Sequence, residues 1–367
     1  MEVFFALAGV EYCAFARYPV GKCLLLEDSL RSFAEKAFHE AEGILFVGAA
    51  GIAVRAIAPF VERKDKDPAV LVLDDGGKYV IPILSGHLGG ANELSKQVAE
   101  FFGAEAVITT ATDGKSLFSP DLFAVKQNAF IAEIDRIKAI SSEILKGNSV
   151  GFLSDYPVEG ILPPELKRDA DLPAGILISD DREKSPFETT LHLIPRKVVL
   201  GVGCRKNIEY DLLYRQIVSV LSEHHLTMEQ VGFLASADIK KEEPALKRLQ
   251  KEWKLTFSTF SAEKLRQLEG EFTPSAFVEA AVGVDNVCER AAMVAAIKET
   301  KRLEEVSNVE GMSVSSEGKA ADVTVKMPSQ SCPGGKKGED FPRFLFRKIA
   351  GNGVTVAAVE LDWRCRF

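Results

Sequence analysis

Paired cysteines, long apolar runs and an excess of positive charge are all missing from this sequence. Its 6 cysteines include no C-x-x-C pair, which argues against a zinc site or a disulfide framework and predicts reduced thiols in a cytoplasmic protein. The early apolar stretch at 3–10 ends at Glu11 and lacks preceding basic residues, so we interpret it as a buried strand and not as a signal peptide or membrane span. The cysteines are Cys13, Cys23, Cys204, Cys288, Cys332 and Cys365.

The balance of charge excludes further classes of partner. Lys and Arg number 45 against 53 Asp and Glu, a net charge of −8, which argues against nucleic acid or an anionic membrane as the main partner. Walker and dinucleotide-binding fingerprints are also absent. What the chain does have is 46% hydrophobic and 27% charged residues over 367 positions. That composition is typical of a soluble globular protein too long for a single core.

Short apolar runs alternate with helical patterns along most of the chain, which predicts an α/β fold. We expect two α/β domains with mainly parallel sheets flanked by helices, joined by a small α/β middle segment. The expected boundaries are 1–128, 129–196 and 197–367. Residues 304–342 are rich in Ser, Gly, Lys and Pro and have few large apolar residues, so we predict a mobile insertion there.

The expected elements follow from this alternation of patterns. In the first domain the strands are Met1–Leu7, Gly43–Val47, Ala69–Leu73, Tyr79–Leu84 and Ala104–Ile108, and the helices are Ser29–His39, Ile52–Pro59 and Gly89–Phe102. The middle segment is expected to open with a helix, Ala129–Lys146, followed by the strands Ser149–Leu153, Ile176–Ile178 and Thr190–Ile194. The last domain is expected to begin with the strand Lys197–Val202 and the helix Ile208–His225.

The densest group of candidate functional residues joins the strand 79–84 to the helix that follows it. Ligands gather at the carboxyl ends of strands in open α/β sheets, and a helix start adds backbone N–H groups and the positive end of a dipole. That dipole favours a neutral His87, able to accept a proton, beside Ser85, which would attack or donate to a carbonyl group. In the alternative, Ser85 caps the helix and His87 satisfies a backbone carbonyl. The candidate binding residues are Gly86, Gly89, Gly90 and Asn92.

Two other strand ends of the first domain carry candidates. Gly51 and Arg55 follow the strand 43–47 and suit an anionic ligand, with tight strand–helix packing as an equal alternative. Thr109, Thr110 and Asp113 follow the strand 104–108 and are expected at the same sheet edge as His87. A cap and turn cluster is the alternative for these three residues.

The last domain has a second glycine-rich junction after its first strand. Gly203, Arg205 and Lys206 place two cations beside N–H groups at a helix start, an arrangement that suits carboxylates or phosphates. The same position would lower the pKa of Cys204, although we prefer a small buried residue there. Lys240 and Lys241 follow the next strand and would face the same ligand, unless they form a solvated face. Glu289 comes three residues after Asn286, a capping pattern, so we leave it out of the site.

Taken in order, these motifs resemble one family. The segments Gly48–Pro59, Asp65–Asp75, Ser85–Asn92, Thr109–Asp113, Gly201–Cys204, Ser236–Glu243 and Val287–Ala292 together are similar to the CbiG family, the cobalt-precorrin-5A hydrolases of anaerobic cobalamin biosynthesis. The resemblance covers most of the chain except the variable middle and residues 304–342. It implies hydrolysis of the δ-lactone of a cobalt-containing corrin precursor, with loss of acetaldehyde to give cobalt-precorrin-5B. Cobalt then arrives inside the substrate, so no cofactor and no protein-bound metal are expected.

This resemblance gives the candidate residues roles. Neutral His87 would take a proton from the attacking water, while Ser85 and the N–H groups near Gly89 and Gly90 would stabilise the oxyanion. Asp113 would accept a proton as the released alkoxide fragments. Covalent attack by Ser85 and direct attack by water both remain open. A transferase of phosphorylated ligands and a non-catalytic carrier of corrinoid intermediates are the rival functions. The expected carboxylate-binding cations are Arg55, Arg205, Lys206, Lys240 and Lys241.

Overall fold

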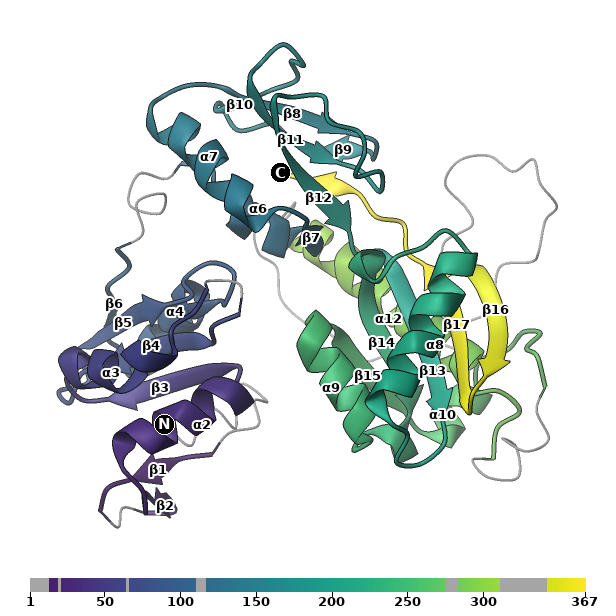
Figure 1. The fold of residues 1–367 in the computed structure, drawn as a ribbon, viewed down its shortest axis with the longest axis horizontal. Helices are drawn as coiled ribbons and strands as arrows, with labels where there is room; N and C mark the ends of the chain where they lie inside the picture. The colour runs from purple at the N-terminus through teal and green to yellow at the C-terminus, as the bar shows by residue number, and fades with distance from the viewer. Residues whose placement is uncertain (1–12, 19–20, 64–65, 110–116, 275–282, 311–341) are drawn as a thin grey trace.

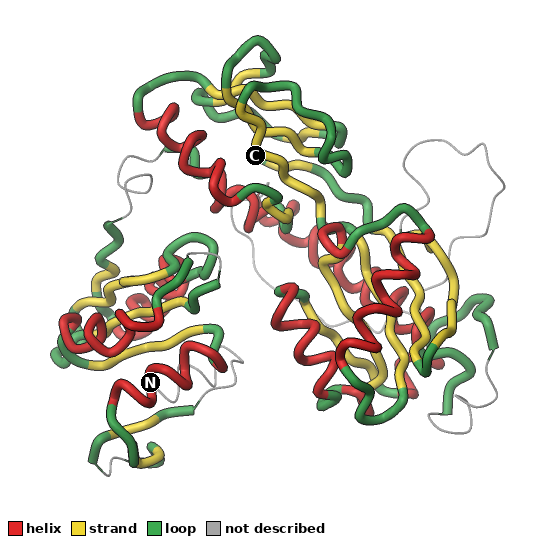
Figure 2. The backbone as a smooth tube through the Cα atoms, viewed as in Figure 1, coloured by secondary structure: helices red, strands yellow, loops and turns green. Residues whose placement is uncertain are grey.

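Figure 1 shows the chain in the computed structural model, which describes residues 13–18, 21–63, 66–109, 117–274, 283–310 and 342–367, the side chains of 303–310 excepted. Residues up to 109 form an N-terminal part, residues 117–195 a middle segment and residues 198–360 a C-terminal part, each with its own sheet. The predicted α/β class, with mostly parallel sheets flanked by helices, is confirmed (Figure 2). Within those described residues, no helix is long and apolar enough to cross a membrane.

The N-terminal part builds a four-stranded sheet in the order β3-β4-β5-β6. Its strands are β3 (Gly43–Val47), β4 (Ala69–Leu73), β5 (Tyr79–Leu84) and β6 (Glu105–Ala106), preceded by a parallel pair, β1 (Phe15–Ala16) and β2 (Leu24–Leu25). Its helices are α2 (Leu30–Glu40), α3 (Ala50–Ile57), the single turn η1 (Ala58–Phe60) and α4 (Ala91–Phe102). The bounds of β3, β4 and β5 are the predicted ones. The strand expected at Met1–Leu7 lies outside the described residues.

The direction of β5 decides which loops of this sheet share an edge. A tight turn joins β4 to β5, in which the Asp74 carboxylate accepts the N–H groups of Lys78 and Tyr79, each at 2.6 Å, and Gly77 has φ +66°. The hairpin makes β5 antiparallel to β4, whereas β3 is parallel to β4 and β6 is parallel to β5. The carboxyl ends of β3 and β4 therefore lie at one edge of the sheet, and those of β5 and β6 lie at the other.

The middle segment has a five-stranded sheet in the order β10-β8-β11-β12-β7, parallel except for β7. The expected helix over 129–146 is wrong at its start, because residues 129–131 form β7 and pair with β12. Asn128, with φ +48°, separates the preceding helix from that strand. The elements are α6 (Pro120–Lys126), β7 (Ala129–Ile131), α7 (Ile134–Leu145), β8 (Val150–Ser154), β9 (Val158–Glu159), β10 (Leu166–Lys167), β11 (Ala174–Ile178) and β12 (Thr189–Pro195).

The C-terminal part has the sheet β15-β14-β13-β17-β16, in which β13, β14 and β15 are parallel and β17 is antiparallel to both of its neighbours. Its strands are β13 (Val198–Cys204), β14 (Val231–Ala237), β15 (Thr256–Phe260), β16 (Arg343–Gly351) and β17 (Val354–Glu360). Its helices are α8 (Tyr210–Glu223), η2 (Met228–Gln230), η3 (Asp238–Lys240), α9 (Pro244–Trp253), α10 (Ala262–Arg266) and α12 (Cys288–Glu310). Helix α12 thus includes the first residues of the predicted insertion, and 311–341 lie outside the described residues.

Helices cover both faces of this sheet (Figure 2). One core joins β13 to α8 and α9, and a second core joins the opposite face to α10 and α12. Alternate residues of β13 enter the two cores, so the strand is apolar throughout, as expected for a sheet buried on both faces. Gly201 is needed in that strand because a Cβ there would lie 1.8 Å from the carbonyl oxygen of Cys288. The last strand, β18 (Cys365–Arg366), leaves this sheet and pairs with β9 of the middle segment.

Candidate functional site

The loop between β5 and α4 is fixed by an unusual backbone and by contacts within the N-terminal part. Ser85 has φ +56°, a conformation that costs a non-glycine residue about 1–2 kcal/mol. The Ser85 side chain is buried, and its hydroxyl donates to the backbone oxygen of Asp67 at 2.9 Å. The proton of Ser85 is thus directed at the protein itself. This corrects the expectation of an attacking or donating hydroxyl: Ser85 shapes the loop.

The N–H groups at the start of α4 are also used by the loop. The N–H groups of Ala91 and Asn92 donate to the oxygens of Ser85 and Gly86, at 3.2 and 2.9 Å, and that of Gly90 donates to the oxygen of His87 at 3.0 Å. Gly90, with φ +80°, is the N-cap residue, so Ser85 does not cap this helix. The Gly90 N–H thus already has a partner within the loop, and the predicted stabilisation of an oxyanion by N–H groups near Gly89 and Gly90 stays a prediction.

The loop places His87 in contact with the middle segment. Its Nδ1 lies 3.1 Å from Oδ1 of Asp121 and 3.2 Å from Oγ of Ser119, and the Ser119 hydroxyl donates to the same Asp121 oxygen at 2.6 Å. The His87 and Asp121 side chains are only 12% and 11% exposed. Ser119 and Asp121 are the N-cap and an early residue of α6. His87 from the loop, with Ser119 and Asp121 from the start of α6, thus form a compact polar cluster.

This cluster is not a linear serine–histidine–carboxylate triad. In such a triad the serine and the carboxylate contact opposite nitrogens of the imidazole, whereas here Ser119 and Asp121 both face Nδ1. The geometry is that of an imidazole oriented by a carboxylate. In the tautomer whose Nδ1–H donates to Asp121, the lone pair of the imidazole is on Nε2. The helix dipole beside His87 can be inferred from neighbouring residues, whereas this carboxylate lies 34 residues away and could not be inferred from the sequence.

The remaining candidates of the N-terminal part fall into three groups. Gly51 and Arg55 follow β3, at the sheet edge opposite His87, and Arg55 Nη1 donates to the Gly51 oxygen at 3.2 Å. The hypothesis that both bind the same ligand as His87 is therefore not supported by the topology. Thr109 is exposed beyond β6, at the edge shared with His87. Thr110 and Asp113 lie outside the described residues, so their roles stay predictions.

Gly86, Gly89 and Asn92 hold the His87 loop together. A Cβ on Gly89 would lie 2.4 Å from the Ser85 Cβ, and one on Gly86 would lie 2.7 Å from Oδ1 of Asn92. Asn92 itself is buried. The glycines are therefore required by close packing within the loop, which is a different reason from the close approach of a ligand that the sequence analysis gave.

The candidates of the C-terminal part do share an edge with one another. Gly203, Arg205 and Lys206 follow β13, and Lys240 and Lys241 follow the parallel strand β14. Lys240 is nevertheless buried, with its Nζ 3.0 Å from Oε2 of Glu243. This corrects its assignment as a ligand-binding cation, because its charge is already paired within the protein.

Two other residues of this part, Cys204 and Glu289, have surroundings that the sequence did not fully predict. Burial raises the pKa of the Cys204 thiol to about 11, so the expected lowering is wrong; the preferred interpretation, a small buried residue, holds in part, because Cys204 is partly buried against the core. Asn286 caps the Glu289 N–H at 2.9 Å, as predicted. The Glu289 carboxylate, however, is fully buried and accepts the N–H groups of Thr273 and Lys348, at 3.2 and 2.9 Å.

The strand directions show which end of the C-terminal sheet holds the predicted cations. The middle segment contacts the amino ends of β13 and β14: the Asn128 side chain reaches the Arg196 oxygen at 3.4 Å, and Lys197 Nζ contacts Asp180 at 2.9 Å. Gly203 and Arg205 lie at the carboxyl end, beside the β16–β17 turn. Gly203 and Arg205 therefore lie at the end of the C-terminal sheet opposite its contact with the middle segment.

A different feature involves the N-terminal part and the middle segment. A cavity of about 540 Å³, open to solvent, is lined by Arg63 of the N-terminal part and by residues 130–136 of the middle segment. Arg63 is linked to the His87 loop through Asp67, whose N–H donates to the Arg63 oxygen at 2.9 Å and whose own oxygen accepts from Ser85. The sequence analysis missed this cavity because its walls come from separate parts of the chain.

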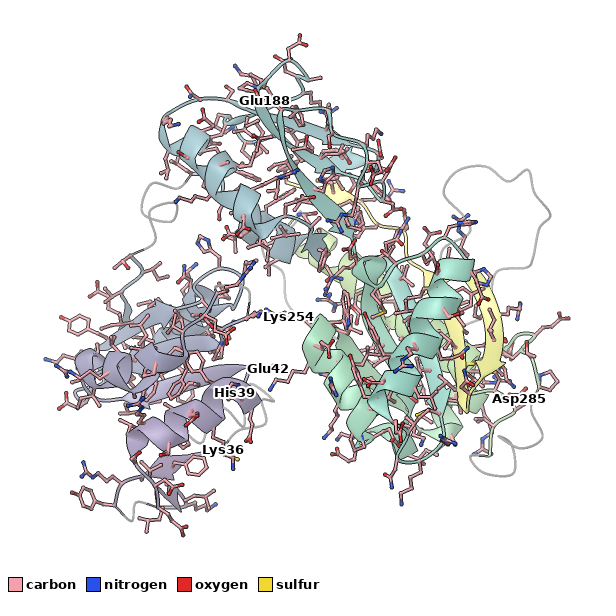
Figure 3. All side chains as sticks on the ribbon, viewed as in Figure 1. Lys36, His39, Glu42, Glu188, Lys254 and Asp285 are labelled. Atoms are coloured by element: carbon pink, nitrogen blue, oxygen red, sulfur yellow. The ribbon has the colours of Figure 1, made fainter. Side chains whose placement is uncertain are left out.

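The N-terminal and C-terminal parts also meet directly. Lys251 of α9 donates to the backbone oxygen of His39 in α2. In Figure 3, Lys36, His39 and Glu42 of the N-terminal part face the end of α9, where Lys254 is labelled. Among the residues that the structure describes, no group of three or more His, Cys, Asp or Glu side chains is placed to hold a metal ion.

Comparison with known proteins agrees with the fold and with the resemblance. Residues 32–113 match the family model described as Cobalamin synthesis G N-terminal, residues 118–195 the Cobalamin biosynthesis central region, and residues 198–359 the Cobalamin synthesis G C-terminus. These α/β modules, in this order, define the class of proteins concerned with cobalamin synthesis. The chain belongs to the CbiG family, and the resemblance seen in the sequence is confirmed.

Two curated relatives carry the same name. The chain is 36% identical over 267 residues to a cobalt-precorrin-5A hydrolase of Salmonella typhimurium, a match that covers 69% of this chain and 76% of the relative. It is 27% identical over 288 residues to a cobalt-precorrin-5A hydrolase of Priestia megaterium, with 74% of this chain and 77% of the relative covered.

Proposed function

We propose that this chain is a cobalt-precorrin-5A hydrolase that opens the δ-lactone of its substrate and releases acetaldehyde to give cobalt-precorrin-5B. Two lines of support meet here: curated relatives named for this activity and the pairing of His87 with Asp121 across two parts of the chain. The single observation that supports the chemistry is this pairing. The carrier alternative is not favoured, because the relatives are named hydrolases. That the reaction needs no cofactor stays a prediction, because cobalt is expected to arrive within the substrate.

His87 is the general base in this proposal. The carboxylate of Asp121 holds the Nδ1 proton, so that Nε2 accepts a proton from water as its oxygen attacks the lactone carbonyl carbon. The carbonyl π bond gives way to a tetrahedral oxyanion, which collapses by breaking the ring C–O bond. The products of this step are a carboxylic acid and an alkoxide on the two-carbon fragment.

The alkoxide then fragments in a retro-aldol-like step. Its oxygen forms a C=O bond while the bond from the two-carbon fragment to the macrocycle breaks, which releases acetaldehyde. The electron pair of the broken C–C bond goes to the macrocycle, where a proton must be added. Asp113, expected earlier to accept a proton at this stage, stays a hypothesis because it lies outside the described residues.

The test is anaerobic incubation of the protein with the lactone-bearing cobalt corrinoid, with acetaldehyde and the mass of the corrinoid measured together. We expect stoichiometric acetaldehyde from the unaltered chain and a loss of at least about 100-fold in rate for His87→Ala. The matched control is His39→Ala, which removes an exposed imidazole of the same part and should keep the rate. An unaltered chain that binds the corrinoid without releasing acetaldehyde would contradict the proposed function.

A further inference from the structure

A second histidine–carboxylate pair lies inside the middle segment. His192 of β12 is 1% exposed, and its Nδ1 lies 3.1 Å from both carboxylate oxygens of Glu133. The other ring nitrogen, Nε2, lies 2.8 Å from the backbone oxygen of Lys184. Glu133 also accepts the backbone N–H of His192 at 3.0 Å. Both nitrogens of a buried imidazole therefore face oxygen atoms.

This geometry requires one more proton than a neutral histidine and an ionised glutamate carry. A backbone carbonyl only accepts, so Nε2 must carry a hydrogen. In a neutral imidazole Nδ1 would then be a lone pair facing a carboxylate, which is repulsive. Either His192 is an imidazolium or Glu133 is a carboxylic acid, and in both cases the pair holds one transferable proton across 3.1 Å.

Glu133 connects that proton to the cavity that Arg63 also lines. It stands at the N-cap position of α7, yet its side chain makes no capping hydrogen bond and turns to His192 instead. Glu133 is also one of the residues that line the 540 Å³ cavity, together with Arg63 and Phe130. The cavity therefore has an acid–base group in its wall, while His192 behind it is closed off from solvent.

We propose that this cavity receives the reacting edge of the substrate and that Glu133 protonates the macrocycle carbon from which acetaldehyde leaves. Glu133 receives this proton from His192. The inference rests on the proposed function and assigns the proton donor of its second step. His87 acts on the lactone and Glu133 acts on the carbon–carbon cleavage. His192 is a positioning residue, because it reaches the substrate only through Glu133.

The protons balance over the two steps. Water gives one proton to His87 Nε2 during attack, which His87 then returns to solvent, and the new carboxylic acid gives a second proton to solvent. The carbon left by acetaldehyde takes one proton from the Glu133–His192 pair, which solvent then restores. One water is consumed, one acetaldehyde is released, and the net proton set free is the one lost by the new carboxylic acid.

Other charged groups surround the pair. Arg182 lies 3.7 Å from Glu133 Oε1 and also contacts Glu229 at 2.9 Å. Asp135 and Arg136 follow on α7, and Arg136 donates to the Thr190 oxygen at 2.5 Å. Lys184, whose carbonyl accepts from His192, directs its Nζ to Asp155.

Arg63 completes the charged groups on the far wall of the cavity. The cations and carboxylates around Glu133 therefore alternate in sign.

The decisive experiment follows both steps in single turnovers under anaerobic conditions, with the corrinoid mass reporting lactone opening and acetaldehyde reporting cleavage. In Glu133→Gln we expect lactone opening within a few-fold of the unaltered rate, a fall of at least about 100-fold in acetaldehyde release, and accumulation of the ring-opened hydroxy acid. Glu133→Asp should restore part of the release. The matched control, Glu188→Gln, changes an exposed glutamate of the same segment and should behave as the unaltered chain.

Two results would decide against the inference. If Glu133→Gln slows both steps equally, or neither, Glu133 is not the proton donor. Should that variant fail to fold, Glu133→Asp still tests the idea, since its shorter carboxylate must slow acetaldehyde release more than lactone opening; an unchanged ratio of the two rates overturns it. An unaltered chain that opens no lactone contradicts the proposed function itself, a result distinct from the other two.

Discussion

At the residue scale, the two buried histidines acquire their chemistry from partners far away in the sequence. Asp121 lies 34 residues from His87, and Glu133 lies 59 residues from His192. A carboxylate at hydrogen-bond distance fixes which ring nitrogen carries the proton. A helix dipole near His87 would act in the opposite sense on the charge of the ring, and the direct contact is the shorter-range and stronger influence. Orientation by Asp121 is therefore the feature of His87 most open to test.

Replacing Asp121 by Asn should remove this orientation without removing the side chain. The amide presents a different pattern of donor and acceptor to Nδ1, so the other tautomer becomes available and Nε2 loses its lone pair for part of the time. We expect the kcat for acetaldehyde release to fall by at least about 100-fold with KM within a few-fold. Ser119→Ala, which leaves the carboxylate in place, should have a smaller effect. Wild-type kcat in Asp121→Asn would contradict the role of the carboxylate.

The Cys204 thiol gives a pH prediction at the same scale. Because burial raises its pKa to about 11, only about a thousandth of this thiol is thiolate at pH 8. Alkylation by iodoacetamide should be slow and should accelerate by about ten-fold per pH unit between pH 8 and 10. The exposed Cys13 is the internal control and should react first. Peptide mass spectrometry after timed quenching distinguishes the two sites, and rapid labelling of Cys204 at pH 7 would disprove the packed environment.

At the scale of elements, close contact between α12 and β13 depends on one missing side chain. A Cβ on Gly201 would lie 1.8 Å from the Cys288 oxygen and 2.9 Å from the Ala292 Cβ. These atoms belong to backbone and to a short side chain, so they move only if the whole helix moves. The contact sets the distance between helix and sheet over one complete core of the C-terminal part.

Gly201→Ala should therefore be strongly destabilising. We expect a loss of about 3 kcal/mol or more in the free energy of unfolding, measured by urea denaturation. Gly51→Ala is the matched control, because Gly51 is exposed in α3 and its added Cβ would meet only Arg55 Nη1, at 3.6 Å. That change should be neutral or stabilising by up to about 1 kcal/mol, since alanine favours a helix. Equal effects of the two changes would show that the α12–β13 contact does not limit stability.

The same scale shows what the sequence could and could not predict. Apolar runs marked β3, β4 and β5 to the residue, because local pattern determines whether a strand forms. They did not give the direction of β5. A signal for it was present, since residues 74–78 read Asp-Asp-Gly-Gly-Lys between two apolar runs, a pattern typical of a hairpin turn. Assigning mainly parallel strands instead placed Gly51 and Arg55 on the wrong sheet edge.

The candidate site was predicted in part for a similar reason. His87 could be singled out from its glycine-rich loop, because the loop is built from neighbouring residues. Asp121, Glu133 and the cavity could not, since each depends on contacts between separate parts of the chain. Lys240 looked like an accessible cation, but its burial depends on how Glu243 folds back to cap Ile208. Residue type and spacing do not determine such contacts.

At the scale of the whole molecule, the end of the chain joins the C-terminal part to the middle segment. Strand β18 pairs with β9, and the indole N–H of Trp363 donates to the Gln127 oxygen at 2.9 Å. Phe367 stacks on Phe123 with ring centres 4.8 Å apart. Phe123 belongs to α6, the helix that holds Asp121. Residues 363–367 therefore support the helix that orients His87.

Removing residues 363–367 should loosen the middle segment and the site together. Phe123 loses its stacked ring, and the core around β8 loses the buried Cys365. We therefore expect faster amide exchange in α6 and β8 and no change in β13 and β14. The rate of acetaldehyde release should fall by about 10-fold or more. Arg364→Ala is the control, because its ion pairs to Asp362 and Glu159 are partly exposed and worth about 1 kcal/mol or less. Exchange that rises equally throughout the chain, or full activity after the deletion, would show that the tail does not position α6.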